Sequence, residues 1–171
     1  CIRDSMIPWQ YTNQWKQLKN SVDTPVCTGE DIYLLEGFKP LIDNEAVSII
    51  HPDLATSGGI LETKKIGDYA QEKGIPMALH QAGSPIVAMA NVHCAAATEG
   101  FIALEMHSVD NPWWDDLVNF ETKKIINNGF VKVPESPGLG ITLNEDAVEK
   151  HLNVNPGLSL IHISEPTRRR L

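Results

Sequence analysis

Four apolar segments of this chain each end on a polar residue that can carry chemistry, and they recur at a nearly constant interval. The segments read PVCTGE, AVSIIHPD, PMALH and FIALE, and they end on Glu30, Asp53, His80 and Glu105. The intervals between those four residues are 23, 27 and 25 residues. Helix-like stretches lie between them, at residues 32–42, 61–73 and 85–98. A short apolar strand followed by a helix, repeated at this length, predicts parallel β/α units.

The polar strand ends are candidates for a shared site. In a barrel of parallel β/α units, the carboxyl ends of the strands gather on one face, where active sites lie. A single polar strand end is usually only solvated, but four in register favour chemistry. We therefore expect the four residues Glu30, Asp53, His80 and Glu105 to converge. His51 and His107 each lie two residues from one of them, on the same strand face, and are candidate substrate contacts.

The number of repeats bounds the architecture. A complete (β/α)8 barrel needs about 250 residues, whereas this chain has 171 residues and four visible repeats. The predicted fold class is therefore α/β, as half of a TIM-type (β/α)8 barrel. We expect residues 6–118 to form the partial barrel and residues 119–157 to form a segment that leaves it.

Charge and cysteine content exclude several classes of partner. The chain has 14 Lys and Arg against 22 Asp and Glu, which argues against a nucleic-acid partner. It contains no 18-residue apolar run and no secretory signal, so no membrane partner is expected. Cys1, Cys27 and Cys94 are scattered, which predicts neither a disulfide framework nor a zinc site. These features favour a cytoplasmic protein.

The two ends differ in composition from the rest of the chain. All four arginines lie near the termini, whereas residues 6–157 contain ten lysines and no arginine. The segments CIRDS (residues 1–5) and LSLIHISEPTR (residues 158–168) resemble translated adapter DNA from transposase-based sequencing libraries. We therefore expect residues 1–5 and 158–171 to be foreign, and residues 6–157 to be a fragment of a longer protein.

The strand-end motifs resemble a known superfamily when they are taken together. The Gly58-Gly59 pair after HPD permits a tight turn into the next helix. Together with TGE, HPD, ALH and LE, this pair is similar to the mandelate racemase/muconate lactonizing enzyme branch of the enolase superfamily, and in particular to its acid-sugar (galactonate/gluconate-type) dehydratases. The resemblance covers about residues 6–154. It includes PESPGLGI (residues 134–141), which is similar to the segment that returns toward the capping domain in this family. The resemblance as a whole implies that the chain is the C-terminal half of the barrel.

The resemblance implies a role for each strand-end residue. Glu30 corresponds to a carboxylate ligand of Mg²⁺, which favours oxygen ligands. His80 corresponds to the base and Asp53 to the residue that orients it, while Glu105 contacts the substrate carboxylate or the developing enediolate. Asp4 falls where a second metal ligand is expected, but within the adapter-like end. Because the other ligand and the opposing lysine motif would lie upstream, we expect this chain alone to be inactive.

The implied chemistry explains the residue types. A proton next to a carboxylate is very weakly acidic, so its removal needs a cation to neutralise the forming charge and a base that works at neutral pH. We expect the parent to be a homo-oligomeric, Mg²⁺-dependent hydro-lyase that removes this proton from a small acid sugar and eliminates water. A racemase or epimerase of the same superfamily is one alternative. A catalytically idle homologue with a binding or regulatory role is another.

Overall fold

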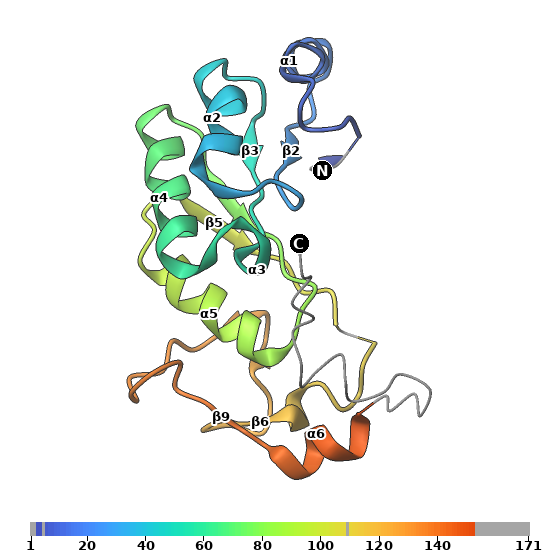
Figure 1. Ribbon diagram of the computed structural model, residues 1–171, viewed down its shortest axis with the longest axis vertical. Coiled ribbons are helices and arrows are strands. Elements are labelled where there is room, and N and C mark those ends of the chain that lie inside the picture. The colour runs from blue at the N-terminus through green and yellow to red at the C-terminus, as the bar shows by residue number, and fades with distance from the viewer. Residues whose placement is uncertain (1–2, 5, 109, 153–171) are drawn as a thin grey trace, which may run out of the picture.

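Five parallel strands form the central sheet of the chain, which we describe from a computed structural model covering residues 3–4, 6–108 and 110–152. The strands are β1 (Arg3–Asp4), β2 (Val26–Thr28), β3 (Ile49–Ile50), β4 (Met77–Leu79) and β5 (Phe101–Leu104). They lie in sequence order, and every neighbouring pair is parallel (Figure 1). The predicted α/β class with repeated parallel units is therefore confirmed.

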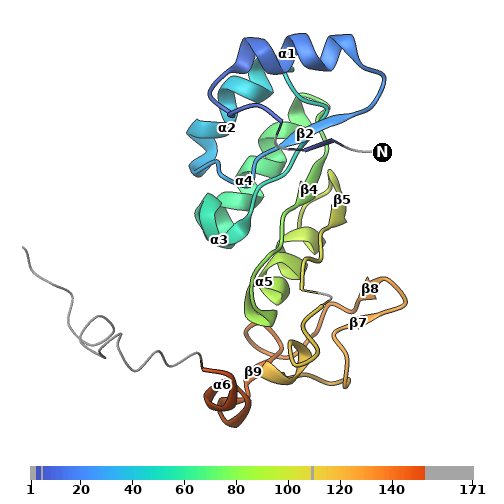
Figure 2. The same cartoon turned by 90° about the vertical axis from the view of Figure 1, so that its right-hand side faces the viewer.

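Helices connect the strands and cover one face of the sheet. They are α1 (Thr12–Ser21), α2 (Leu34–Asp43), α3 (Leu54–Ser57), α4 (Gly59–Glu72) and α5 (Pro85–Ala96). Helix α2 packs against α4, which in turn packs against α5, and the three run along the same side of the strands (Figure 2). The three predicted helices agree with α2, α4 and α5 to within a few residues. Sequence patterning missed α1 and α3.

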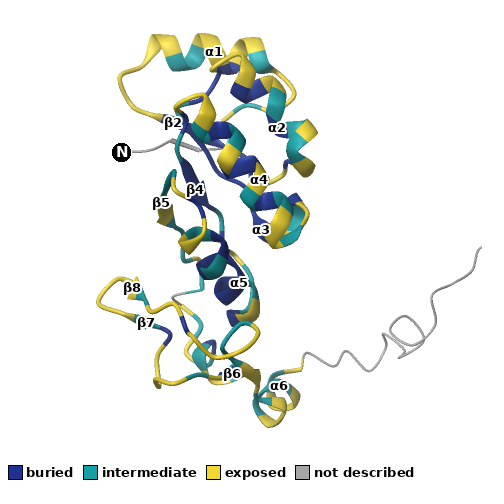
Figure 3. Cartoon of the chain, turned by 90° about the vertical axis from the view of Figure 1, so that its left-hand side faces the viewer, coloured by how far each residue is buried: buried dark blue, intermediate teal, exposed yellow. Residues whose placement is uncertain are grey.

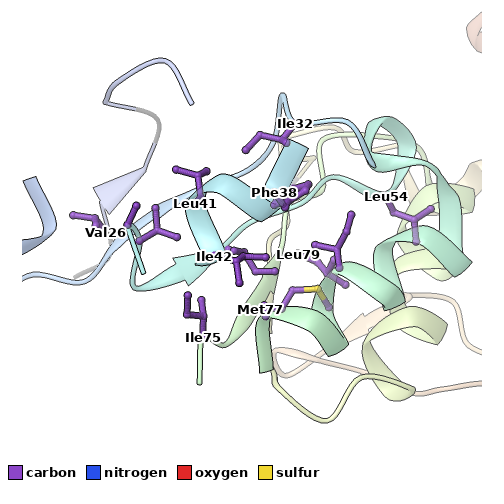
Figure 4. Close-up of a cluster of buried hydrophobic side chains, with 14 of the residues drawn as sticks. Val26, Ile32, Phe38, Leu41, Ile42, Leu54, Ile75, Met77 and Leu79 are labelled. Atoms are coloured by element: carbon purple, nitrogen blue, oxygen red, sulfur yellow. The ribbon is translucent and has the colours of Figure 1, made fainter. Parts of the chain in front are cut away.

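The main core fills the space between these helices and the sheet. Figure 3 shows the buried residues of α2 and α4 on their inner sides and the exposed residues on their outer sides. The apolar side chains of this core include Phe38, Leu41 and Ile42 of α2 and Met77 and Leu79 of β4 (Figure 4). Ile66 of α4 belongs to the same cluster. All residues of β2 and β4 are buried, as expected for inner strands of a parallel sheet. Burial of this apolar surface is the main stabilising contribution to the fold.

The sheet is open at both ends within the described residues. β1 and β5 are its edge strands, and β5 is only partly buried, with Ile102 50% exposed. The described strands therefore form an open sheet and not a closed barrel, in agreement with the predicted half-barrel.

The last described part of the chain lies beside α5. It comprises a 3-10 turn, η1 (Asp115–Leu117), two small antiparallel pairs and a helix, α6 (Glu145–His151). The pairs are β6 (Val118–Asn119) with β9 (Thr142–Leu143), and β7 (Ile126–Asn127) with β8 (Phe130–Val131). A second apolar cluster, which includes Met89, Val92 and Trp114, joins this region to α5. The predicted domain boundary near residue 118 remains a prediction.

Two expectations from the sequence concern the adapter-like ends of the chain and a membrane-spanning helix. Residues 1–2, 5 and 158–171 of the adapter-like segments lie outside the described residues, whereas Arg3–Asp4 form strand β1. Within the described part of the chain, no helix has the length and apolar character needed to cross a bilayer.

Candidate active site

The four predicted site residues lie at the carboxyl ends of four consecutive parallel strands. Glu30 follows β2 and Glu105 follows β5, while Asp53 and His80 form a parallel bridge just beyond β3 and β4. The backbone N–H of His80 donates a hydrogen bond to the Pro52 carbonyl at 3.0 Å, which extends the pairing of β3 and β4 to the site. These positions agree with those expected from the sequence, whereas the roles of the four residues stay a prediction.

His80 is the centre of the cluster. Its Nδ1 lies 2.7 Å from Oδ2 of Asp53, and its Nε2 lies 3.0 Å from Oε2 of Glu30. Because Asp53 can only accept, the hydrogen bond at Nδ1 fixes the proton there in the neutral ring and leaves the lone pair on Nε2. When protonated, the same ring donates from both nitrogens to carboxylates that are already in place. The arrangement is therefore suited to proton transfer at Nε2.

Asp53 is held by a second contact. Its Oδ1 accepts a hydrogen bond from the Ala55 backbone N–H at 2.8 Å, so that Asp53 is the N-cap of the single-turn helix α3. One oxygen of the Asp53 carboxylate thus caps helix α3, and the other orients the His80 ring. This cap stabilises α3, because it pairs a backbone N–H of the first turn that would otherwise lack a partner. Sequence patterning missed α3 because four residues are too few to show a helical period.

Gly29 allows the Glu30 loop to approach β3 closely. A Cβ at position 29 would lie 2.6 Å from the His51 carbonyl carbon and 2.8 Å from its nitrogen, and the φ of Gly29 is +155°. The His51 backbone N–H donates to the Thr28 carbonyl at 2.9 Å across the same contact. The glycine of TGE is therefore a structural requirement that brings Glu30 within reach of His80. This role is not visible in the sequence pattern, because it depends on a contact between distant residues.

His51 and His107 both face Glu105. Nε2 of His51 lies 3.5 Å from Oε2 of Glu105, and Nε2 of His107 lies 3.5 Å from Oε1. Oε2 of Glu105 is also 3.6 Å from Nε2 of His80. The structure thus gathers all six predicted site residues in one cluster. Whether His51 and His107 contact substrate stays a prediction.

A cavity of about 430 Å³ lies beside Glu30. Its lining includes Trp9 and Gln10 from the loop after β1, Thr28 at the end of β2, and Asp31 from the loop after β2. The Pro8 carbonyl holds the first loop by accepting hydrogen bonds from the Tyr11 backbone N–H and the indole Nε1 of Trp15. Trp9 and Gln10 were missed by sequence reasoning, since an irregular loop carries no periodic signal.

The described residues fit a magnesium site only in part. Glu30 offers the hard carboxylate oxygen that Mg²⁺ prefers. Among residues 3–4, 6–108 and 110–152, however, no group of three or more His, Cys, Asp or Glu side chains is arranged to hold a metal ion. Glu30 is therefore a candidate ligand and not a complete site.

The fold and the strand-end cluster define a β/α-barrel enzyme domain, and comparison with known proteins identifies its family. Residues 4–147 match the family described as enolase C-terminal domain-like, and the chain belongs to it. This membership, together with the open sheet of parallel strands, confirms the predicted C-terminal half of an enolase-superfamily barrel.

Several relatives are named as dehydratases of acid sugars. The chain is 44% identical to a D-xylonate dehydratase of Haloferax volcanii over 88% of its own length and 36% of that protein's. It is 31% identical to an arabinonate dehydratase of Saccharolobus solfataricus over 85% of its length and 38% of that protein's. The chain therefore spans little more than a third of these relatives.

A solved structure supports the same assignment. A mandelate racemase/muconate lactonizing enzyme-like protein from Rubrobacter xylanophilus superposes with a TM-score of 0.84 at 34% identity. The superposition covers 86% of this chain and 38% of that one.

Proposed function

We propose that this chain is the C-terminal part of a Mg²⁺-dependent acid-sugar dehydratase. The observation that carries the proposal is the Asp53–His80 pair, whose Nδ1–Oδ2 distance is 2.7 Å and whose Nε2 faces Glu30 and Glu105. Relatives named D-xylonate, D-gluconate/D-galactonate and arabinonate dehydratases support an acid-sugar substrate.

His80 removes the proton from the carbon next to the substrate carboxylate. Nε2 accepts this proton, because Nδ1 is engaged with Asp53. The resulting imidazolium is stabilised by the Asp53 carboxylate, which accepts a hydrogen bond from Nδ1. Proton abstraction breaks the C2–H bond and leaves the electron pair delocalised over the substrate carboxylate as an enediolate.

Elimination of water follows from the same geometry. The electron pair forms the C2–C3 double bond as the C3 hydroxyl departs, and protonated His80 supplies a proton to that hydroxyl, so that water leaves. The product is the enol of a 2-oxo-3-deoxy acid, which converts to the keto form. His80 returns to its neutral form, and the cycle is balanced without an oxidant or a reductant.

We assign Glu30 as one of the Mg²⁺ ligands of the full-length protein. When bound, the cation neutralises charge on the substrate carboxylate. Glu105, whose side chain is 34% exposed, faces the same space from the end of β5 and orients the substrate from the other side of His80.

A racemase or another isomerase is the second candidate. A 3,6-anhydro-D-galactonate cycloisomerase from Zobellia galactanivorans superposes on this chain with a TM-score of 0.76 at 31% identity. Proton removal by a histidine is compatible with either outcome. A racemase needs a second base on the opposite face of the substrate, whereas a dehydratase needs a leaving hydroxyl.

Product analysis with the full-length parent tests the proposal. The parent, recovered from its source DNA, is incubated with Mg²⁺ and a panel of C5 and C6 aldonates, and 2-oxo-3-deoxy acids are measured. We expect water loss from at least one aldonate and no activity from the 171-residue chain. Epimerised substrate without a 2-oxo product would support the isomerase instead. Turnover by the 171-residue chain would contradict the need for upstream residues.

A further inference from the structure

Glu105 has one carboxylate oxygen in an unusual setting. Its Oε2 is buried and makes no hydrogen bond within the part of the chain that the structure describes. It lies between two imidazole nitrogens, with Nε2 of His51 at 3.5 Å and Nε2 of His80 at 3.6 Å. A buried charged oxygen is costly unless it gains a donor, so this position implies a partner in the working enzyme. Catalytic hydrogen bonds are often long without substrate and shorten when it binds.

The backbone holds His51 firmly. Its N–H donates to the Thr28 carbonyl at 2.9 Å, and the carbonyl of the next residue, Pro52, accepts from the His80 N–H at 3.0 Å. Pro52 also restricts His51 to extended backbone angles. The missing side chain of Gly29 lets the neighbouring loop press against the His51 backbone. Two strands and a loop thus fix the backbone from which the His51 side chain projects.

Of the two candidate substrate contacts, His51 is by far the more buried. Its side chain is 9% exposed, whereas that of His107 is 63% exposed. The ring meets His80 edge to face, with centroids 5.4 Å apart and an interplanar angle of 78°. This contact places Nε2 of His51 on the Glu105 side of His80.

We propose that His51 is a positioning residue that acts through Glu105. Nε2–H of His51 donates to Oε2 of Glu105 and keeps this carboxylate directed at the reaction centre beside His80. Without that donor the carboxylate is free to turn toward exposed His107, which lies 3.5 Å from its other oxygen. The expected effect on catalysis rests on the proposed function. The orientation of Glu105 by His51 rests on the geometry alone.

Two substitutions separate the donor from the shape of the ring. His51→Phe keeps a planar ring but has no N–H, whereas His51→Gln keeps an N–H donor near the position of Nε2. In the full-length parent we expect His51→Phe to lower kcat about tenfold or more, the effect of losing a hydrogen bond to a charged group, with KM changed by less than about twofold. His51→Gln restores most of kcat. His93→Gln is the matched control. His93 lies on α5, outside the cluster, and its Nε2 is 3.2 Å from the Leu139 carbonyl oxygen.

A double-mutant cycle and a crystal structure decide the inference. In a Glu105→Gln background, His51→Phe lowers kcat by less than about twofold further, because the residue on which it acts has already changed. In the crystal structure of the His51→Phe parent, the Glu105 carboxylate is turned away from His80. Three results would each overturn the proposal. The first is an equal loss of kcat in His51→Phe and His51→Gln, and the second is an undiminished effect of His51→Phe in the Glu105→Gln background. The third is a Glu105 carboxylate that has not moved in the crystal structure. If the wild-type parent converts no acid sugar, the proposed function fails, and the position of Glu105 still decides this inference.

Discussion

At the residue scale, Gly29 sets how closely the Glu30 loop can approach β3. We predict that Gly29→Ala lowers the free energy of unfolding by about 1–3 kcal/mol, since the new Cβ would overlap the His51 backbone at a strained φ. Gly74→Ala is the matched control, because Gly74 also has a positive φ (+70°) but no atom within 4 Å of a built Cβ. Urea unfolding of both variants measures the difference. Equal losses would show that the close approach to His51 is unimportant.

Cys94 illustrates how burial controls reactivity. Its side chain is fully buried on α5, and burial raises the pKa of the thiol. A raised pKa lowers the thiolate fraction at any given pH, so we predict very slow alkylation by iodoacetamide at neutral pH. Mass spectrometry of the Cys94 peptide before and after addition of urea tests this. Rapid labelling of the native protein would contradict the buried position.

The four strand-end residues could be predicted because each follows an apolar run, and parallel strands bring their carboxyl ends together. The role of Gly29 could not, because it depends on a contact with a residue 22 positions away. The same reason applies to the His51–Glu105 pair, which joins the ends of β3 and β5. Sequence spacing indicates which residues share a face, but not which atoms meet.

At the element scale, Gly67 sets the distance of α4 from the sheet. Replacing a glycine inside a helix by alanine normally stabilises it by about 0.5–1 kcal/mol. Here a Cβ would lie 2.7 Å from Cγ2 of Thr98 and 3.0 Å from the Met77 sulfur, both buried. We therefore predict that Gly67→Ala destabilises the protein by about 1–3 kcal/mol through overpacking.

Chemical denaturation measures this change, with exposed Glu72→Ala at the end of the same helix as the control. The control is expected to stay within about 0.5 kcal/mol of wild type. A stabilised Gly67→Ala variant would show that α4 can move away from β4 without lowering the free energy of unfolding.

Helices α2, α4 and α5 were predictable because each buries apolar residues between strands at a regular interval. Helix α1 was not, since Trp15 is its only buried residue and gives no apolar period. Its position depends on one indole packed into the main core.

At the scale of the whole molecule, the open sheet is the main liability of the chain. β5 is an edge strand, and Ile102 on it is half exposed. Unpaired strand edges promote association between chains, so we predict that the 171-residue chain forms oligomers in a concentration-dependent way. Light scattering over a dilution series measures the mass.

A lysine on the edge should weaken this association, because charge at an edge strand opposes pairing. We predict a smaller mass for Ile102→Lys than for the control Ile60→Lys, in which Ile60 is 43% exposed on α4. A chain that stays monomeric at all concentrations would contradict the role assigned to the open edge.

In the proposed reaction, Nε2 of His80 removes the proton next to the substrate carboxylate. The most direct measurement is proton NMR of an aldonate panel in D₂O with the full-length parent, its His80→Asn variant and the His93→Asn control. We predict that the C2 proton signal disappears with the parent and with His93→Asn. It should persist with His80→Asn, because an amide cannot accept that proton. Loss of the signal at an unchanged rate with His80→Asn would contradict the assignment of the base.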